Sequence, residues 1–407
     1  MKVLHVIQSL SRGGVTNVVI ESIKAFCRLN IENIVIAPQI SNSLKPIIQE
    51  NTSQVYLLGG NAKPFNSIEY ILLTKKHINE IVKRENPDAV IVQPGWLSLY
   101  SYFLPRNLPI LIVVHGTYLN EIKYMWYHPI RGVVRLRYIN GILLSQAIEL
   151  FQLRMSILNQ NATIIAVSKN TKKELGKMGV PTSRIVSILN GVNKERFKPM
   201  NKDLAKTLVE ELFGTKLKVR VLLHVNPGPR KGTHILIKAF AILKKIYGED
   251  LMLLIVGRLG PKTYREYVEE LIRSLDLEGD VVMLGYVENE KLPVLYNAAD
   301  LTVVPSYSEG GPLITPESLA CGTPVVATNV GGNPEYLKLV DLTHLLINIE
   351  KYDFACALAN GILRALEHEN FFRQSILLNY RRIPSWEDST LNYVKLLEVS
   401  MTRFGYD

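Results

Sequence analysis

The sequence is poor in the features that mark secreted, metal-binding or membrane-spanning proteins. Only three of its 407 residues are cysteines, Cys27, Cys321 and Cys356, and their separation fits neither a zinc-ligand spacing nor a disulfide framework. The longest apolar runs, such as 108–114, fall well short of the ~20 residues that cross a bilayer. The N-terminus reads as a strand and lacks the parts of a signal peptide. We therefore expect a cytoplasmic protein of a reducing compartment.

Acidic residues are scarce in the first half of the chain. Residues 1–200 hold 24 Lys+Arg and 11 Asp+Glu, a balance of +13, whereas the whole chain carries +10. A basic half favours an anionic partner, and the alternative is a solvated surface of skewed composition. Nucleic acid is not expected as that partner, because no recognition motif accompanies the charge.

Short apolar runs alternate with amphipathic helical patterns along the whole sequence. This alternation predicts an α/β fold in which helices cover both faces of parallel sheets. The nearly continuous Val/Ile/Leu runs are typical of strands that are buried on both sides. The expected strands are 3–7, 33–37, 54–58, 89–92, 110–115, 164–168, 185–189, 219–225, 251–256, 281–284, 301–305 and 325–327.

The alternation pauses at the polar stretch 193–218, and a new strand begins after it. We interpret this pause as the boundary between two doubly wound domains, residues 1–195 and residues 196–385. A chain of 407 residues suits two domains at ~100–200 residues each. Ligands in such sheets bind outside the carboxyl ends of the strands, so two facing domains are expected to enclose a cleft.

Segment 306–324 carries the strongest functional pattern. Glu309 and Glu317 stand eight positions apart, and a Gly-Gly-Pro turn follows the first. A turn that opens into a helix directs free backbone N–H groups and the helix dipole at an anion. We expect Glu309 beside that anion and Glu317, about two turns into the helix, beside a hydroxyl-bearing group. A phosphate flanked by two hydroxyl-binding carboxylates indicates a nucleotide-sugar.

Two cations, Arg230 and Lys231, stand where another strand-to-helix loop ends. Cations oppose the helix dipole at this position, and a bound diphosphate would explain them. Lys231 could neutralise charge that builds on a departing phosphate. The alternative is a pair of solvated loop charges.

Two loops of the first half also follow expected strands. Gly13 and Gly14 would allow a ligand to approach the backbone closely, and the alternative is a turn that needs positive φ. His115 ends a buried strand and is expected to point into the cleft, where it would bind a sugar hydroxyl or orient an acceptor. Its alternative is a hydrogen-bonded structural histidine.

Taken together, these residues resemble the retaining glycosyltransferases of family 4, whose GT-B fold has two Rossmann-like domains facing a central cleft. The similarity covers nearly the whole chain, and the order and spacing of the motifs make it specific. The motifs are Ala166-Val167-Ser168, Asn190-Gly191-Val192, Arg230-Lys231-Gly232, Gly285-Tyr286-Val287, Pro305-Ser306, Glu309 to Glu317, Ala320-Cys321-Gly322-Thr323-Pro324 and Gly331-Gly332.

The resemblance implies roles for the matching positions. Glu309 and His115 would lie near the transferred sugar, Lys231 would bind the diphosphate, and Glu317 would bind the ribose hydroxyls. It implies further donor-binding residues with backbone or base contacts: Gly13, Gly14, Arg230, Tyr286, Gly310, Gly311, Pro312, Leu313 and Ile314. The family needs neither metal nor cofactor, and the chain has no Asp-x-Asp pair. The last helix, 386–407, would pack back on the first domain.

Two positions depart from the family pattern. Asn226 stands where the family usually has an arginine, and Arg230 would compensate from another direction. The common Glu-Gly-Phe-Gly reads Glu-Gly-Gly-Pro at 309–312, with a proline where a first helical turn tolerates one. Neither departure removes Lys231 or the two glutamates.

We predict an enzyme that moves a sugar from a nucleoside diphosphate to a hydroxyl with retention of configuration. No nucleophile–base pair is evident, which favours same-face attack assisted by the leaving phosphate. Segment 123–137 mixes aromatic and basic residues and precedes the apolar run 138–153, which favours a lipid-linked acceptor or glycan precursor at an anionic membrane face. The protein would then be peripheral on the inner face of the cell membrane. The alternative for this segment is a buried helix with a basic exposed side. The alternatives for the activity are a nucleotide-sugar epimerase and an inactive binding subunit.

Overall fold

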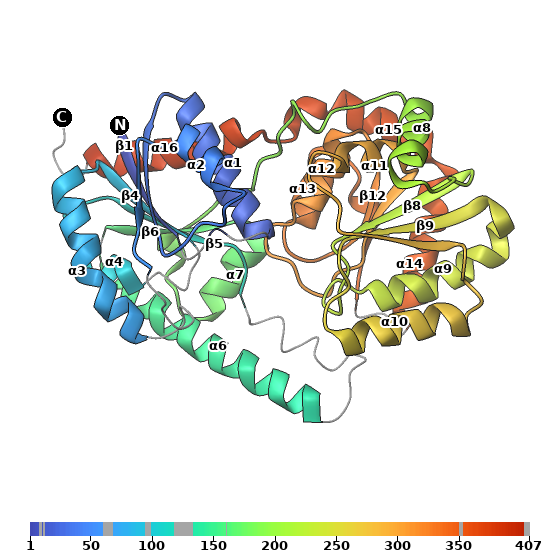
Figure 1. Ribbon diagram of the computed structural model, residues 1–407, viewed down its shortest axis with the longest axis horizontal. Helices are drawn as coiled ribbons and strands as arrows, with labels where there is room; N and C mark the ends of the chain where they lie inside the picture. The colour runs from blue at the N-terminus through green and yellow to red at the C-terminus, as the bar shows by residue number, and fades with distance from the viewer. Residues whose placement is uncertain are drawn as a thin grey trace. The chain divides into compact units, whose positions relative to one another are not determined.

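The computed structural model describes residues 1–7, 10, 13–59, 68–93, 99–117, 133–159, 161–349 and 353–402 (Figure 1). The chain divides into compact units, each built on a parallel sheet. The first unit contains Met1–Leu119, Gly141–Gly191 and Pro384–Asp407, and the second contains Asn120–Asn140 and Val192–Ile383. The predicted α/β fold with doubly wound parallel sheets is confirmed.

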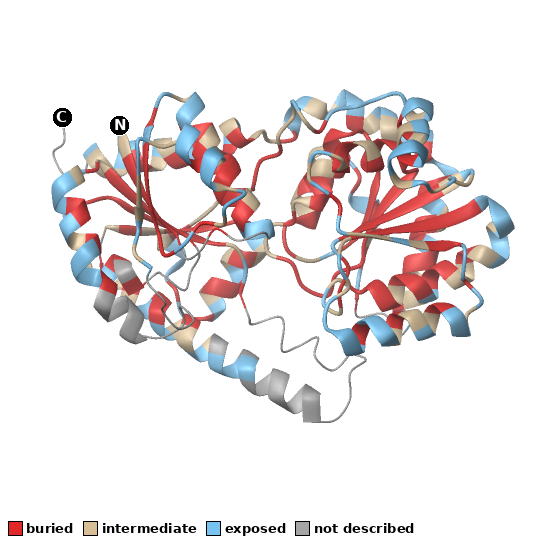
Figure 2. Cartoon of the chain, in the orientation of Figure 1, coloured by how far each residue is buried: buried red, intermediate tan, exposed pale blue. Residues whose placement is uncertain are grey.

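The first unit holds a seven-stranded sheet whose strand order is β3-β2-β1-β4-β5-β6-β7 among the described residues. The strand order reverses between β1 and β4. In doubly wound folds, ligands bind at such a switch point, outside the carboxyl ends of the strands. Figure 2 shows the central strands as buried, in agreement with their apolar sequences. The strands are β1 (Lys2–Ile7), β2 (Glu32–Ala37), β3 (Gln54–Leu57), β4 (Ala89–Gln93), β5 (Ile110–Val114), β6 (Ala162–Ala166) and β7 (Ile185–Ser187).

Helices cover both faces of this sheet because successive strand residues point to opposite sides. Leu4 and Val6 pack in one core with side chains of α3, α4, α6 and α7. Val3 packs in another core with Phe26 of α1 and Leu397 of α16. The helices are α1 (Gly14–Arg28), α2 (Lys45–Glu50), α3 (Ile68–Glu85), α4 (Leu99–Phe103), α6 (Val133–Ile157), α7 (Lys169–Lys177) and α16 (Trp386–Thr402).

The C-terminal helix α16 belongs to the first unit and packs beside α1. Arg28 of α1 forms an ion pair with Glu387, and the hydroxyl of Ser389 donates to the carbonyl of Leu189 at 2.8 Å. The segment before α16 passes so close to Gly191 that an added Cβ there would lie 2.3 Å from a backbone oxygen. A glycine is therefore required at that position for this packing.

The second unit holds a six-stranded parallel sheet of order β10-β9-β8-β11-β12-β13. Its strands are β8 (Arg220–Val225), β9 (Leu251–Val256), β10 (Val281–Gly285), β11 (Leu301–Val304), β12 (Val325–Thr328) and β13 (Leu346–Ile347). Its helices are α8 (Lys202–Phe213), α9 (Thr233–Tyr247), α10 (Lys262–Ser274), α11 (Leu292–Ala298), α12 (Ile314–Ala320), α13 (Asn333–Leu339), α14 (Phe354–Glu367) and α15 (Glu369–Leu378). The sequence did not predict β13, because two residues are too short to give an apolar run.

The polar stretch 193–218 contains the helix α8, which packs on α11 in the second unit. Asn201 caps its first turn by accepting from the Leu204 amide at 3.0 Å, and Gly214 ends it at φ +63°. Only Ala205 and Val209 are buried within it, so its apolar stripe was too narrow to reveal a helix. The pause in the alternation is thus an element of the second unit.

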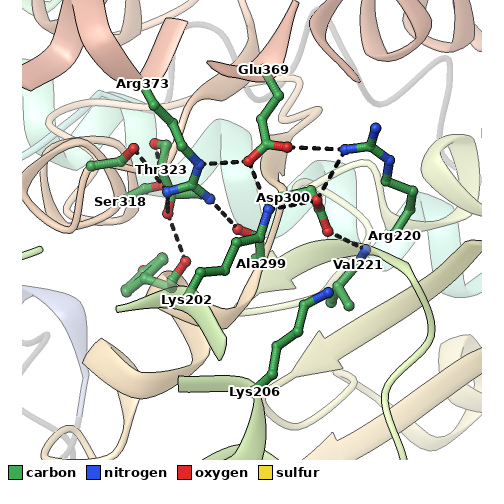
Figure 3. Close-up of polar contacts among 12 residues, drawn as sticks. Lys202, Lys206, Arg220, Val221, Ala299, Asp300, Ser318, Thr323, Glu369 and Arg373 are labelled. Carbon is green, nitrogen blue, oxygen red and sulfur yellow. Dashed lines mark hydrogen bonds and ion pairs between the residues drawn. The ribbon is translucent and has the colours of Figure 1, made fainter. Parts of the chain in front are cut away.

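A buried charge network binds α8, β8 and α15 together (Figure 3). The carboxylates of Asp300 and Glu369 are almost fully buried. Lys202 Nζ lies 2.7 Å from an oxygen of each, and Arg220 Nη1 lies 3.3 and 3.0 Å from them. Arg373 Nε completes the set at 2.5 Å from Glu369. The burial of each carboxylate is offset by more than one cation.

Arg373 also binds two backbone carbonyls, one before β11 and one just after α12. Its guanidinium donates to the carbonyls of Ala299 at 2.6 Å and Gly322 at 3.1 Å. Because α12 ends at Ala320, this contact fixes the C-terminal end of the helix that carries Glu317.

Candidate active site

Two strand-to-helix loops of the second unit meet at a lysine–glutamate pair. Lys231 precedes α9, and Glu309 lies between β11 and α12. The ammonium of Lys231 is 2.6 Å from Oε1 of Glu309, and the Ser306 hydroxyl donates to the same oxygen at 2.7 Å. The Arg230 guanidinium lies 3.7 Å from the other oxygen, Oε2. The structure therefore brings together Arg230, Lys231 and Glu309 as one charged group.

The surroundings of Glu309 keep its carboxylate ionised. Only 6% of its side chain is exposed, and the side chain of Lys231 is 12% exposed. Burial acts to raise the pKa of Glu309, but the Lys231 and Arg230 cations and the hydrogen bonds from Lys231 and Ser306 outweigh it, so the pKa lies below its usual value. The pair is a buried cation beside a buried anion.

Backbone contacts interlock the two loops. The Tyr307 amide donates to the Arg230 carbonyl at 2.8 Å, and the Arg230 guanidinium donates to the Ser308 carbonyl at 2.5 Å. Gly232 adopts φ +69°, and a Cβ there would lie 2.1 Å from the carbonyl oxygen of Pro305. Glycine is required at 232 because both the backbone angle and the close approach exclude a side chain.

Gly331 supports Glu309 from behind. It adopts φ +56°, and a Cβ on it would lie 2.5 Å from the Glu309 carbonyl oxygen and 2.6 Å from the Glu309 Cβ. The glycine at position 331 therefore allows the close packing of this turn against the backbone of Glu309.

Glu317 lies about one turn into its helix, and the expected two turns are wrong. The helix α12 begins at Ile314, so Glu317 is its fourth residue. Residues 310–312 lie outside the helix, and Leu313 is its N-cap, whose carbonyl accepts from the Glu317 amide at 3.0 Å. Glu317 accepts a hydrogen bond at 3.0 Å from the hydroxyl of Tyr296, a fully buried residue of α11 that sequence reasoning missed. No spacing rule links residues on two separate helices.

The loop after Glu309 is partly accessible. Gly310, Gly311 and Leu313 are half-buried, whereas Pro312 and Ile314 are buried. The ring of Pro312 would lie 3.3 Å from a Cβ at Gly332, so the proline packs against the 331–332 turn.

Tyr286 follows Gly285, which has φ +67°. The phenol side chain is large and residue 286 is 48% exposed, with the Arg258 guanidinium 5.8 Å from the ring centre. This places an aromatic face and a cation at the carboxyl end of β10, and the implied contact with a base stays a prediction.

His115 lies in the first unit, directly after β5. Its Nε2 is 3.3 Å from Oε1 of Gln93, a buried residue at the end of β4. An amide oxygen only accepts, so Nε2 carries the proton of the neutral ring. Desolvation lowers the His115 pKa to about 4, which keeps the ring neutral near pH 7. Sequence reasoning missed Gln93, which lies just beyond the expected strand 89–92.

A buried carboxyl group holds the loop after His115. Glu174 of α7 accepts from the Thr117 hydroxyl at 2.5 Å and also from the Asn170 amide. Burial raises the pKa of Glu174, although these hydrogen bonds and Lys177 oppose the rise. The sequence offered no signal for this contact, because 57 positions separate Thr117 from Glu174.

Gly13 and Gly14 are not required by the fold. Gly13 is extended, at φ 165°, and Gly14 begins α1, so the alternative of a turn with positive φ is wrong. A Cβ at either position would meet no heavy atom of the described chain within 4 Å. Both glycines are exposed.

The predicted membrane segment 123–137 lies outside the residues whose side chains the structure describes. Among the described helices, none combines the length and apolar character needed to cross a membrane. Within the same residues, no cluster of three or more His, Cys, Asp and Glu side chains could hold a metal ion.

Two doubly wound units, each built on a parallel sheet, are the architecture of the GT-B fold. HepE of Anabaena, solved in complex with UDP, shares this fold with a TM-score of 0.73 and 19% identity over 98% of this chain and 100% of that chain. Residues 12–196 match the model of glycosyltransferase family 4, and residues 214–376 match that of the glycosyl transferases group 1. The chain belongs to glycosyltransferase family 4, as its motifs predicted.

Curated relatives share part of the chain. An uncharacterized glycosyltransferase of Methanocaldococcus jannaschii is 27% identical over 60% of this chain and 62% of its own. A D-inositol 3-phosphate glycosyltransferase of Rhodococcus erythropolis is 31% identical over 43% of this chain and 40% of its own. This chain therefore spans less than two-thirds of the length of these relatives.

Proposed function

We propose that this protein transfers a sugar from a nucleoside-diphosphate sugar to a hydroxyl acceptor, retains the anomeric configuration and needs no metal. The observation that carries the proposal is the pair Lys231 and Glu309, 2.6 Å apart on adjacent loops of the second unit. A buried ammonium beside an ionised carboxylate can bind a phosphate and a sugar hydroxyl side by side. Family membership supports this assignment.

In the proposed reaction, the bond between the anomeric carbon and the diphosphate oxygen breaks, and its electron pair passes to the phosphate. Lys231 and Arg230 supply the positive charge that stabilises the leaving diphosphate. An ammonium has three N–H donors, so Lys231 can bind a phosphate oxygen while it keeps Glu309. The acceptor hydroxyl attacks from the same face and gives its proton to the leaving phosphate oxygen.

Glu309 and His115 are proposed to position the sugar, and Glu317 to bind the ribose hydroxyls. The hydrogen bond from the Tyr296 hydroxyl supports the last role, since it orients the half-buried Glu317 carboxylate just after the 310–314 loop. The open space at Gly13 and Gly14 supports approach of the donor phosphates to their backbone. The UDP complex of HepE makes uridine diphosphate sugars the first donors to test.

We also propose a lipid-linked acceptor at an anionic membrane face. The described part of α6 exposes Leu143, Leu144 and Phe151, and Leu158 follows the helix, with exposed fractions of 48, 64, 48 and 59%. The seven-residue spacing of Leu144, Phe151 and Leu158 places them on one side, and an apolar stripe in a basic half of the chain suits anionic lipid. We expect the wild-type protein to co-sediment with vesicles of anionic lipid at low salt. The double variant Leu144→Gln with Phe151→Gln should co-sediment less. Equal binding to neutral vesicles, or none to either, would count against this acceptor.

The activity is tested by incubating the protein with a panel of nucleoside-diphosphate sugars and hydroxyl acceptors, with and without EDTA. Nuclear magnetic resonance of the product should show the same anomeric configuration as in the donor. The product should form at the same rate with and without EDTA. An inverted product would refute retention, and loss of activity in EDTA would refute metal independence. An isomerised donor would indicate an epimerase, and an unchanged donor with nucleotide binding would indicate an inactive subunit. Thermal shift with nucleotides selects the panel, because a bound ligand raises stability by mass action.

A further inference from the structure

The hydroxyl of Thr233 joins a buried histidine to the loop that carries Lys231. Thr233 is the first residue of α9 and is fully buried, and His224 lies in β8 with 2% of its surface exposed. Thr233 Oγ1 is 2.9 Å from His224 Nε2 and 2.9 Å from the backbone nitrogen of Gly228. The other ring nitrogen of His224, Nδ1, is 3.0 Å from the carbonyl oxygen of Val303 in β11.

These partners set the direction of the shorter contacts, and the Gly228 carbonyl, 3.4 Å from Thr233 Oγ1, is a second, longer acceptor for the hydroxyl. A carbonyl only accepts, so Nδ1 of His224 donates to Val303 and Nε2 of the neutral ring accepts. The Thr233 hydroxyl therefore donates to Nε2. Its oxygen is left to accept from the Gly228 amide, which can only donate. The contacts run in one direction, from the loop through Thr233 to the sheet.

Gly228 anchors the loop at both of its backbone groups. Its amide binds Thr233, and its carbonyl accepts from the Lys231 amide at 3.1 Å. Arg230 and Lys231 therefore lie between two fixed points, Gly228 at one end and Thr233 at the other.

We propose that His224 and Thr233 are positioning residues that set the shape of the phosphate-binding loop and so the place of the Lys231 ammonium. This inference rests on the proposed function, since it concerns the affinity for a nucleoside diphosphate. A purely structural hydrogen bond would stabilise the core without regard to Lys231. A positioning role instead couples Thr233 to Lys231, and that coupling can be measured.

The test is a double-mutant cycle with UDP as the probe, read by isothermal titration calorimetry. Thr233→Val keeps the shape of the side chain and removes the hydroxyl, whereas Thr233→Ser keeps the hydroxyl. We expect Thr233→Val to weaken UDP binding about tenfold, which is about 1.4 kcal/mol, and Thr233→Ser to stay within about twofold of the wild type. In a Lys231→Ala background, Thr233→Val should change the affinity by less than about twofold, because the ammonium it positions is gone.

A matched control is Thr171→Val in α7, which removes another fully buried threonine hydroxyl, 3.0 Å from Ser168, in the first unit. It should lower the melting temperature without the tenfold loss of affinity. Should Thr233→Val fail to fold, Thr233→Ala takes its place in the cycle.

Each other outcome refutes a defined claim. A tenfold effect of Thr233→Val that persists in the Lys231→Ala background, or that Thr171→Val reproduces, would overturn the positioning role. So would unchanged affinity in Thr233→Val when Lys231→Ala alone weakens binding. A wild-type protein that binds neither UDP nor any other nucleoside diphosphate would overturn the proposed function, and this inference with it.

Discussion

The ammonium of Lys231 and the carboxylate of Glu309 lie 2.6 Å apart although 78 positions separate them in the chain. The loops that carry them follow β8 and β11, which are neighbours in the parallel sheet of the second unit. Parallel neighbours end at the same edge of a sheet, so their following loops meet there. Two charged residues that the sequence suggested separately thus form one pair, and the pair decides what the first experiments should change.

Lys231→Met should reduce kcat about 100-fold to 1000-fold, because it removes a preorganised cation from the leaving group. It should also lower the free energy of unfolding by about 3 kcal/mol, because Glu309 keeps its buried charge without its nearest cation. Steady-state kinetics and urea denaturation measure the two effects.

The double variant Lys231→Met with Glu309→Gln is the control. It should regain much of the lost stability and none of the activity. Full kcat in Lys231→Met would contradict the phosphate role.

Gly331→Ala should displace Glu309, since the new Cβ would overlap the glutamate backbone at 2.5 Å and residue 331 would need a left-handed conformation. We expect a loss of at least about 2 kcal/mol in unfolding free energy and a marked fall in kcat. Urea denaturation and steady-state kinetics detect both, and wild-type kinetics in this variant would show that Glu309 need not be held there.

Gly13→Ala should leave the melting temperature unchanged, because a Cβ there meets no described atom within 4 Å and the backbone is extended. If donor phosphates approach this backbone, the added methyl group should raise the KM for the donor severalfold. Gly331→Ala serves as the opposite case, in which stability falls. An unchanged KM would remove the predicted donor contact at Gly13.

Stability should fall as the pH decreases from about 6.5, in part because of His5. This histidine is fully buried in β1, with Nε2 2.9 Å from Asn33 Oδ1. Burial lowers its pKa to about 4, although the Asn33 hydrogen bond opposes the decrease. The unfolded chain binds the proton at its ordinary pKa of 6.5, so the stabilisation is present above 6.5 and is lost as the pH falls toward 4.

Urea denaturation of wild-type protein and of His5→Gln at pH 7 and pH 5 checks this effect. The variant should lose about 2 kcal/mol less than the wild type between these two values. Parallel losses in both proteins would mean that His5 does not drive the pH dependence.

Arg373→Met should destabilise the second unit by about 2–3 kcal/mol. The change removes one cation from Glu369 and the donor to the carbonyl of Ala299 (Figure 3). It also removes the donor to the carbonyl of Gly322. The stability of Arg373→Lys should lie between those of the wild type and Arg373→Met. The lysine ammonium keeps the positive charge but lacks the planar set of donors of the guanidinium. Urea denaturation measures the order, and a lysine variant as unstable as the methionine variant would assign the effect to geometry alone.

The sequence by itself determined the strands, the fold class and the family. Apolar runs predicted all strands of both described sheets except β13. A strand that is buried on both faces consists of consecutive apolar residues, so it is visible in the sequence. The motifs identified Lys231, Glu309 and Glu317 as candidate site residues. This was possible because glycine, proline and charged residues after a strand are recognised from neighbouring positions in the sequence. Local periodicity missed α8, whose exposed surface leaves only a narrow apolar stripe.

Only the tertiary structure decided which of these residues touch. It paired Lys231 with Glu309, gave Glu317 a partner in Tyr296, His115 a partner in Gln93, and showed that the fold does not require Gly13. Strand order in a parallel sheet is set by packing between distant segments, so no local pattern encodes which loops become neighbours. The candidate residues were visible in the sequence, but the contacts that combine them depend on the order of the strands.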